Sequence, residues 1–473
     1  VSSPLLLLTL ICPLMKSLKY SLPALALLLG LSSCGLYKKY ERPQDIQTEV
    51  FRPEQIATVG TDTTSLAQLP WQGLFTDVQL QTLIRQALKQ NVDLLTASLS
   101  VKQAEAQLRS ARLSFFPSLT ISPSVTSRKV EDTPTSSSYE LPIQASWQVD
   151  LFGSLLNSSR ATQVQLLRAR EYQRLVQSRV IASVANGYYT LLMLDAQLAL
   201  SQEAAKLAQH TLEVMEAQKQ YGRVLESAVQ SARANLHQVQ ASLPEIRRQI
   251  TVAENALSLL LGESPRSYQR GSLASQSLPQ ELGLGLPVQL LAQRPDVRVA
   301  EMALANCYYQ TNIARSAFYP ALTISGSVGW MGTLGTAVAN PMKFVANAVG
   351  ALAQPIFARG KLVAGLKVAQ AEQEKALLAF QQSLYNAGAE VSNALALYEA
   401  SRARVAEEVL QLASLKENVS ITETLFKSGR SSSYLEVITA QQALLQAQLT
   451  EVRDRFSQMQ AVVNLYNALG GGA

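Results

Sequence analysis

Proline is absent from two long stretches of the 473-residue chain, residues 143–243 and residues 356–473. A proline inside a helix removes a hydrogen bond, clashes with the preceding turn and destabilises the helix by about 3 kcal/mol. Both stretches are also rich in alanine, glutamine and leucine, which favour helix. The sequence therefore predicts very long helices in both stretches.

Within these stretches, apolar residues recur at an average spacing of about 3.5 residues, the period of a coiled-coil seam. Gly222 and Gly429 fall where the helices must reverse, and glycine commonly ends a helix. We expect two antiparallel helical hairpins, and the arm from Ser154 to about Tyr221 would be about 100 Å long. The seam residues are Val176, Val180, Val184, Leu191, Leu194 and Leu198 in the first stretch and Val391, Leu395, Tyr398, Val405, Val409 and Leu412 in the second.

Composition excludes two classes of protein. Charged residues make up only 16% of the chain, against about 25% in a typical soluble protein. However, no apolar run of about 20 residues follows residue 34, which argues against a polytopic helical membrane protein. The formal net charge is +6, but the basic residues are interspersed and form no run or stripe, so we expect no nucleic-acid partner.

The N-terminal residues from Met15 onward have the order of a bacterial secretion signal: a basic start, a short apolar core, and small residues before Cys34. The ending Leu-Ser-Ser-Cys resembles a lipobox, in which cleavage leaves a cysteine whose thiol carries lipid. We expect residues 1–33 to be the signal peptide, with the true start at Met15. Residues 34–77 would form an extended segment anchored by lipid on Cys34. A transmembrane anchor is the disfavoured alternative, because the apolar core is too short to span.

The chain offers no catalytic or metal-binding cluster. Cys307 is the only cysteine in the sequence after Cys34. We expect it to be a small buried residue rather than a nucleophile. The two histidines, His210 and His237, are predicted on opposite arms of one hairpin, far from any cysteine. Metal sites and general-base catalysis draw on clustered His, Cys, Asp and Glu. We therefore predict a protein that is not an enzyme and has no cofactor or metal apart from the lipid on Cys34.

The chain is a tandem duplication. Ala111–Ser122 aligns with Ala314–Ser325, with eight identities in twelve residues at an offset of 203. Phe152 pairs with Phe357, and Gly222 pairs with Gly429, at similar offsets. The predicted first repeat covers 78–286, with a helix over 78–116, a β-hairpin over 118–151, a helical hairpin over 153–262 and a linker. The predicted second repeat covers 287–469, with a helix over 288–318, a β-hairpin over 321–357 and a helical hairpin over 358–469. A glycine-rich tail over 470–473 follows.

The hairpins contain four segments of 10–13 residues in which apolar and polar residues alternate, the pattern of a strand with one apolar face. That length is enough for a tilted strand to cross a bilayer, but a half-buried soluble sheet shows the same alternation. Four strands cannot close a barrel, so if they span, several chains must share one. The predicted lipid-facing residues are Leu119, Ile121, Leu141, Ile143, Trp147, Leu322, Ile324 and Trp330.

Several motifs resemble one family. Leu291–Val297 is similar to an L-x-x-R-P-D-I motif, and both repeats carry segments similar to A-x-F/Y-P-x-L-T/S-I. Trp71–Phe75 resembles the opening helix of the same family, and Gly429–Gln441 resembles its second periplasmic turn. On these motifs the chain resembles the TolC-like outer-membrane efflux family, in its NodT-type lipoprotein branch.

The resemblance implies a mainly helical fold with membrane β-structure. Four transmembrane strands per protomer would contribute to a shared twelve-stranded barrel of a homotrimer, and the long antiparallel coiled-coil helices would form a tunnel in the periplasm. The chain would lie in the cell outer membrane, in contact with its lipid. Its partners would be a periplasmic adaptor and an inner-membrane pump of the resistance-nodulation-division type, which supplies the energy. The chain itself would be a passive, gated exit duct.

The resemblance also implies sites at the helix ends, although the simpler interpretation of the glycines is plain helix caps. Many relatives have a gating aspartate where this chain has Thr439; Glu436, nearly one turn earlier, either substitutes in part or is an ordinary exposed carboxylate. Two alternative functions remain open, a conduit for type I protein secretion and a periplasmic coiled-coil scaffold or adaptor. The candidate tip and gate residues are Gly222, Arg223, Gly429, Arg430, Tyr434, Glu436 and Thr439.

Overall fold

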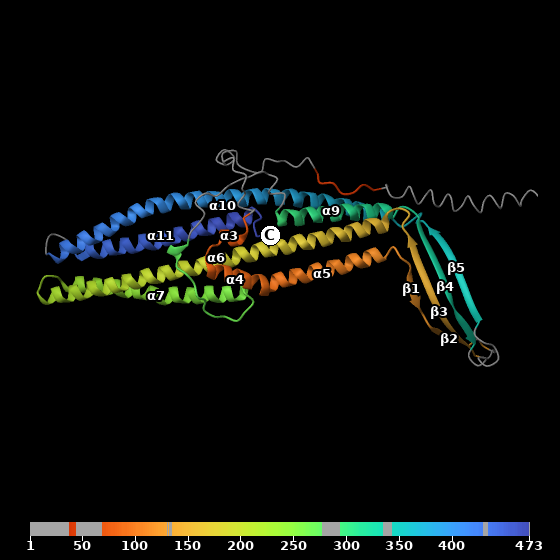
Figure 1. The fold of residues 1–473 in the computed structure, drawn as a ribbon, viewed down its shortest axis with the longest axis horizontal. Coiled ribbons are helices and arrows are strands. Elements are labelled where there is room, and N and C mark those ends of the chain that lie inside the picture. Colours follow the sequence, from red (N-terminus) through yellow and green to blue (C-terminus); the bar gives the residue numbers. More distant parts are fainter. Residues whose placement is uncertain are drawn as a thin grey trace, which may run out of the picture. The chain divides into compact units, whose positions relative to one another are not determined.

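The computed structural model describes residues 37–43, 69–129, 131, 135–276, 294–333, 343–428 and 434–472. The chain divides into two compact units, each assembled from separate stretches (Figure 1). Each unit takes residues from both sequence repeats. The sheet unit comprises Val1–Asp45, Val101–Ala169 and Ala300–Phe380, and the helical unit comprises Ile46–Ser100, Arg170–Val299 and Gln381–Ala473.

The main helices come in pairs of equal length, one member from each repeat. This agreement confirms the two long helices and their return arms, and it supports the tandem duplication. In the described part of the chain, no helix combines the length and the apolarity that a membrane crossing requires. The pairs are α6 (Ser154–Gln220) and α10 (Lys361–Lys427), with 67 residues each, α7 (Glu226–Leu260) and α11 (Tyr434–Ala468), with 35 each, and α5 (Val92–Leu113) and α9 (Pro295–Ser316), with 22 each.

The prediction of one helix over 78–116 was wrong, because the chain breaks at Asn91 into α4 (Val78–Gln90) and α5. Asn91 has an extended backbone, and its side-chain oxygen accepts the N–H of Leu94 at 3.0 Å, which caps α5. Its amide also donates to the carbonyl oxygen of Leu260 at 2.9 Å. Asparagine favours such caps over helix interiors. A short helix, α3 (Trp71–Leu74), precedes α4, and residues 288–293 of the second predicted helix lie outside the described residues.

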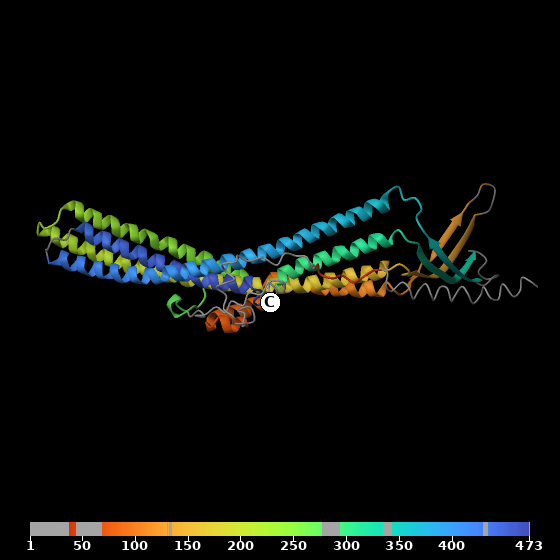
Figure 2. The same ribbon diagram turned by 90° about the horizontal axis from the view of Figure 1, so that it is seen from above.

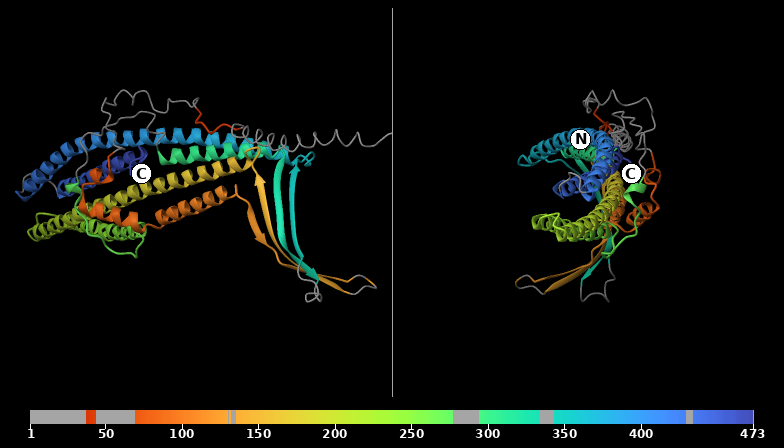
Figure 3. Two further views of the ribbon diagram at one scale, coloured as in Figure 1. Left: turned by 45° about the vertical axis from the view of Figure 1, so that its right-hand side comes forward. Right: turned by 90° about the vertical axis from the view of Figure 1, so that its left-hand side faces the viewer.

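The strands form one antiparallel sheet in the order β1-β3-β4-β5, in which β2 also pairs with β3 (Figure 3). The first edge was predicted as a single strand, but it is split into β1 and β2 at Ser122 and Pro123. Both segments keep one register against β3, and the split occurs because Pro123 and Pro142, on facing strands, have no N–H to donate. The strands are β1 (Ser118–Ile121), β2 (Ser124–Arg128), β3 (Ser136–Val149), β4 (Ala321–Thr333) and β5 (Lys343–Ala353).

Helices connect directly to the strands within the sheet unit. Leu108 of α5 packs with Leu166 of α6, and Val164 of α6 packs with Tyr309 of α9. The hydroxyl of Thr311 in α9 donates to the carbonyl oxygen of Ala369 in α10 at 3.2 Å. The row α5, α6, α9 and α10 therefore carries β1, β3, β4 and β5 at its ends, one strand to each helix.

The helical unit buries most of the first predicted seam: Val176, Val180, Val184, Leu191 and Leu194 of α6 are at most 8% exposed. The second seam holds only as far as Tyr398. Beyond it Val405 and Leu412 are half-buried, Val409 is 50% exposed, and Glu408 is buried instead. A stripe with a 3.5-residue spacing drifts around a 3.6-residue helix, which is why the prediction fails near the end of a long arm.

Candidate functional site

The sheet presents one apolar face. The register sets Leu141 opposite Trp330, Trp147 opposite Ile324, and Ile121 opposite Ile143. The eight residues predicted to face lipid therefore lie on a single face. Within the sheet unit seven of them are exposed, and only Leu322 is half-buried. An exposed apolar surface of this extent marks a site of contact with a membrane or a partner.

An aromatic junction lies where the strands meet their helices. The rings of Phe152 and Tyr319 are stacked, with centroids 4.9 Å apart and an interplanar angle of 13°. Trp147 donates from its indole nitrogen to the carbonyl oxygen of Phe115 at 2.9 Å. Aromatic rings are enriched at the two boundaries of a bilayer, so this end of the sheet has the composition of a membrane boundary.

The segment that follows Cys34 is fixed to the sheet unit, although Cys34 itself lies outside the described residues. Tyr37 packs against Gly153, just after β3. Arg42 forms a two-pronged ion pair with Glu301 of α9 and lies over the ring of Phe380. Burial and the nearby Glu301 carboxylate raise the pKa of Tyr40 to about 12. The described residues nearest to Cys34 are thus held at the junction of helices and strands.

At the far end of α6, the chain reverses through a Schellman motif. Gly222 has a left-handed φ of +66°, and its N–H donates to the carbonyl oxygen of Lys219 at 2.9 Å. The N–H of Arg223 donates to the carbonyl oxygen of Gln218 at 3.0 Å. Gly222 is therefore a helix cap, and its contact with a partner stays a prediction. Arg223 is exposed, and Tyr221 beside it is 81% exposed.

The ends of α6, α7, α10 and α11 pack side by side in the helical unit (Figure 2). Met215, Leu236 and Ile438 belong to their shared apolar cluster. Buried Gln441 of α11 donates to Thr211 of α6 at 3.1 Å and to Glu423 of α10 at 3.0 Å. The four helix ends are therefore joined by both apolar packing and directed hydrogen bonds.

The remaining tip candidates divide between packing and exposure. Tyr434 packs against the apolar cluster, whereas Glu436 and Thr439 are exposed on one side of α11. Their spacing of three residues places them on the same helix face. Gly429 and Arg430 lie outside the described residues. The structure thus brings Glu436 and Thr439 together and leaves their gating role as a prediction.

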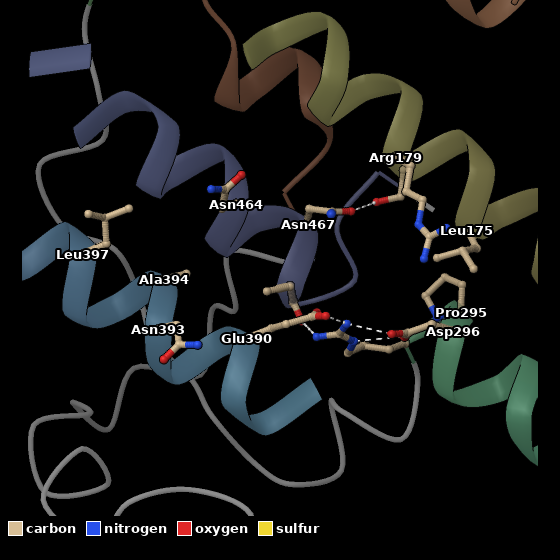
Figure 4. A pocket seen from close by; sticks show the side chains of 13 residues that line it. Leu175, Arg179, Pro295, Asp296, Glu390, Asn393, Ala394, Leu397, Asn464 and Asn467 are labelled. Atoms are coloured by element: carbon tan, nitrogen blue, oxygen red, sulfur yellow. Dashed lines mark hydrogen bonds and ion pairs between the residues drawn. The ribbon is translucent and has the colours of Figure 1, made fainter. Parts of the chain in front are cut away.

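Arg294, from the R-P-D motif, is 5% exposed and joins three helices. Figure 4 shows two of its partners, Asp296 and Glu390, pointing toward one another. Arg294 binds Asp296 of α9 through two nitrogens, at 3.0 and 2.8 Å, and Glu390 of α10 at 2.5 Å. It also donates to the carbonyl oxygen of Ala468 in α11 at 2.6 Å. Burial alone would lower the pKa of Arg294, but the two carboxylates outweigh it and the pKa is raised. The motif is therefore an internal clamp beside a cavity of about 370 Å³, and nothing in its geometry points to catalysis.

Residues Glu408 of α10 and Asp454 of α11 form a buried carboxyl pair that the sequence analysis missed. Their exposures are 9% and 3%, and Arg404 contacts Asp454 at 2.6 Å. Burial, and then the hydrogen bond to Asp454, raise the pKa of Glu408 to about 7. The sequence shows only that each of the two helices carries an acid. Periodicity in a single sequence does not reveal that both acids are buried or that these helices face each other.

Other chemistry-bearing residues are dispersed. Within the described ranges, no three His, Cys, Asp or Glu side chains come together as metal ligands. His210 and His237 are exposed on α6 and α7. Cys307 is partly exposed rather than buried as predicted, and burial together with Glu372 raises the pKa of its thiol. A raised pKa disfavours the reactive thiolate.

We predict that Arg294→Met lowers the free energy of unfolding by roughly 3 kcal/mol, because it leaves Asp296 and a helix-end carbonyl without their buried cation. The matched control is Arg298→Met. Arg298 is 3.7 Å from Glu171 with a 41% exposed side chain, so its loss should change stability by less than about 1 kcal/mol. Denaturant titration of the purified chain compares the two, and equal effects would contradict the clamp.

We also predict a pH-dependent effect of Glu408→Gln. The pKa of Glu408 in the folded chain lies above its ordinary 4.5, so the stabilisation it provides is complete below about pH 4.5 and is lost as the pH rises through 7. The glutamine variant should match the natural chain at pH 4.5 and exceed its stability at pH 9 by roughly 1–3 kcal/mol. Exposed Glu407→Gln is the control, with a small difference at both pH values. Thermal unfolding measures both, and a pH-independent result for Glu408→Gln would contradict the pair.

Comparison with known proteins is consistent with this geometry. The family described as "Outer membrane efflux protein" matches residues 83–263 and 286–471. The cation efflux system protein CusC of Escherichia coli K12 is 30% identical over 447 residues, which cover 94% of this chain and 97% of CusC. The probable outer membrane lipoprotein SilC of Salmonella typhimurium is 28% identical over 462 residues, which cover 96% of this chain and 99% of SilC.

Solved structures agree over nearly the whole chain. A structure of CusC superposes with a TM-score of 0.82 at 28% identity and covers 92% of this chain and 99% of that one. The open-state MtrE outer membrane channel of Neisseria gonorrhoeae gives a TM-score of 0.82 at 26% identity, over 92% of this chain and 98% of that one. The matched residues span both repeats, and the chain belongs to the outer membrane efflux protein family.

Proposed function

We propose that the chain is the outer-membrane exit duct of a tripartite efflux pump. It conducts substrates passively to the exterior from a periplasmic adaptor and an inner-membrane pump of the resistance-nodulation-division type. The observation that carries this proposal is a sheet with one exposed apolar face and two edges that are unpaired among the described residues, joined to 67-residue helices. One relative named as a cation efflux system protein and another named as a solvent efflux pump outer membrane protein support it.

The working duct is a homotrimer. The four rows of the sheet are too few to close, and a bilayer core does not tolerate open edges. Three copies supply twelve strands for one barrel, and their long helices form a tunnel in the periplasm. Apolar side chains exposed along α10 in the single chain support contact between copies. They include Val368, Leu378, Val409, Leu410 and Ile421.

In this proposal, the adaptor-facing tip is the part of the helical unit where the ends of α6, α7, α10 and α11 pack together. The turn at Gly222 and Arg223 and its counterpart at Gly429 and Arg430 would contact the adaptor. The exposed pair Glu436 and Thr439 would line the gate, where a threonine replaces the usual acidic charge. We assign no particular cargo, because the similar proteins are named for cations in one case and for solvents in another.

Lipid on Cys34 anchors the chain in the membrane. Support comes from Tyr37, only three residues later, which lies at the aromatic junction beside Gly153. An acyl chain on Cys34 would therefore enter the bilayer close to the strands. We predict that labelled palmitate is incorporated by the natural chain and by Cys307→Ala, but not by Cys34→Ala. Label that persists in Cys34→Ala would overturn the assignment.

Ile143→Arg and Gln144→Arg test the duct and the orientation of its strands together. These neighbours lie at one depth on opposite faces of β3. Arginine at position 143 should destabilise the assembly by about 2–4 kcal/mol if that face contacts lipid at mid-depth, whereas position 144 faces the lumen and should tolerate it. The readouts are the yield of membrane-inserted oligomer and stepwise ion conductance in planar bilayers. Equal yields would contradict the lipid face, and a natural chain without conductance would contradict the duct.

A further inference from the structure

The two repeats build the junction between strand and helix in the same way. In the first repeat, the side chain of Trp147 donates to the carbonyl oxygen of Phe115 at 2.9 Å. In the second, the side chain of Gln354 donates to the carbonyl oxygen of Phe318 at 3.4 Å. Phe115 and Phe318 are equivalent by the repeat offset of 203. The duplication therefore extends to individual side-chain hydrogen bonds.

A different contact joins the first repeat to the second. β3 pairs with β4 along twelve residues, and just past this ladder Phe152 stacks on Tyr319. Phe152 lies in the connection that follows the second strand of its hairpin. Tyr319 lies between the end of α9 and the start of β4, the first strand of the next hairpin. The stack therefore marks the place where one repeat ends and the next begins.

The chain also contains the two residues equivalent to this pair, but they lie next to opposite edges of the sheet. In the sequence, Phe357 corresponds to Phe152 at an offset of 205 and follows β5, at one edge of the sheet; Phe116 corresponds to Tyr319 at an offset of 203 and precedes β1, at the other edge. Phe357 is 85% exposed and Phe116 is 69% exposed. Neither makes a ring contact among the described residues. Among the described residues, each therefore lacks the ring partner that its counterpart in the Phe152–Tyr319 stack has.

We propose that Phe357 of one copy stacks on Phe116 of the neighbouring copy, which repeats between chains the Phe152–Tyr319 stack within a chain. The proposal rests on the trimer of the proposed function and deepens it by naming the contact that closes the ring. The open edge of β5 meets the open β1–β2 edge of the next copy as β3 meets β4.

Cysteine cross-linking tests the contact in the full, lipid-anchored chain. The background is Cys307→Ser, and Cys34 is kept for its lipid. The test variant carries Phe116→Cys and Phe357→Cys and is treated with a short bifunctional thiol reagent. The matched control carries Phe152→Cys and Tyr319→Cys, whose cross-link closes within one chain. Denaturing gels after the reaction should show dimers and trimers for the test variant, monomers for the control, and monomers for each single cysteine.

A second measurement protects the test from a variant that fails to assemble. Phe357→Ala and Phe116→Ala should each make the oligomer dissociate at a lower temperature in detergent, and the double variant should dissociate no earlier than the worse single one. A conducting oligomer that gives no cross-link between chains, while the control cross-links within them, would overturn the stack alone. A natural chain that is monomeric and does not conduct would overturn the proposed function with it.

Discussion

The backbone hydrogen bonds at the two edges of the sheet are the constraint on which the rest of the structure depends. Between the edges, β3 and β4 are paired on both sides, but the outer groups of β1, β2 and β5 have no partner among the described residues. The apolar face formed by residues such as Leu141 and Trp330 favours lipid, where no water can satisfy those groups. In the proposed trimer, copies of the chain that meet edge to edge would resolve the conflict.

Duplication accounts for how one chain supplies two sheet edges that could pair with each other. Each repeat places a helix, a pair of strand rows and a long helical hairpin in the same order, and the helices match in length residue for residue. In the proposed trimer, the contact between repeats within the chain would be a template for the contact between chains. The Arg294 clamp and the Gln441 hydrogen bonds act elsewhere, holding the helical unit together.

Periodicity and glycine positions were enough to predict the long helices, the sheet face and the reversal at Gly222, because each reflects a local backbone rule. The break at Asn91 and the split at Pro123 depend on single polar or proline residues that override a periodic pattern. The Glu408–Asp454 pair and the surroundings of Arg294 could not be predicted, since they depend on which helices face each other. The motif marked Arg294, but only its partners in the folded chain explain its role.

Native mass spectrometry of the lipid-anchored chain, released from detergent, tests the central claim most directly. If the sheet edges are satisfied only by copies of the same chain, the complex contains three chains. When it dissociates, the separated chains unfold or aggregate and do not persist as stable folded monomers. A folded single chain that stays monodisperse in buffer without detergent would contradict the account, because its apolar face and both sheet edges would then be stable in water.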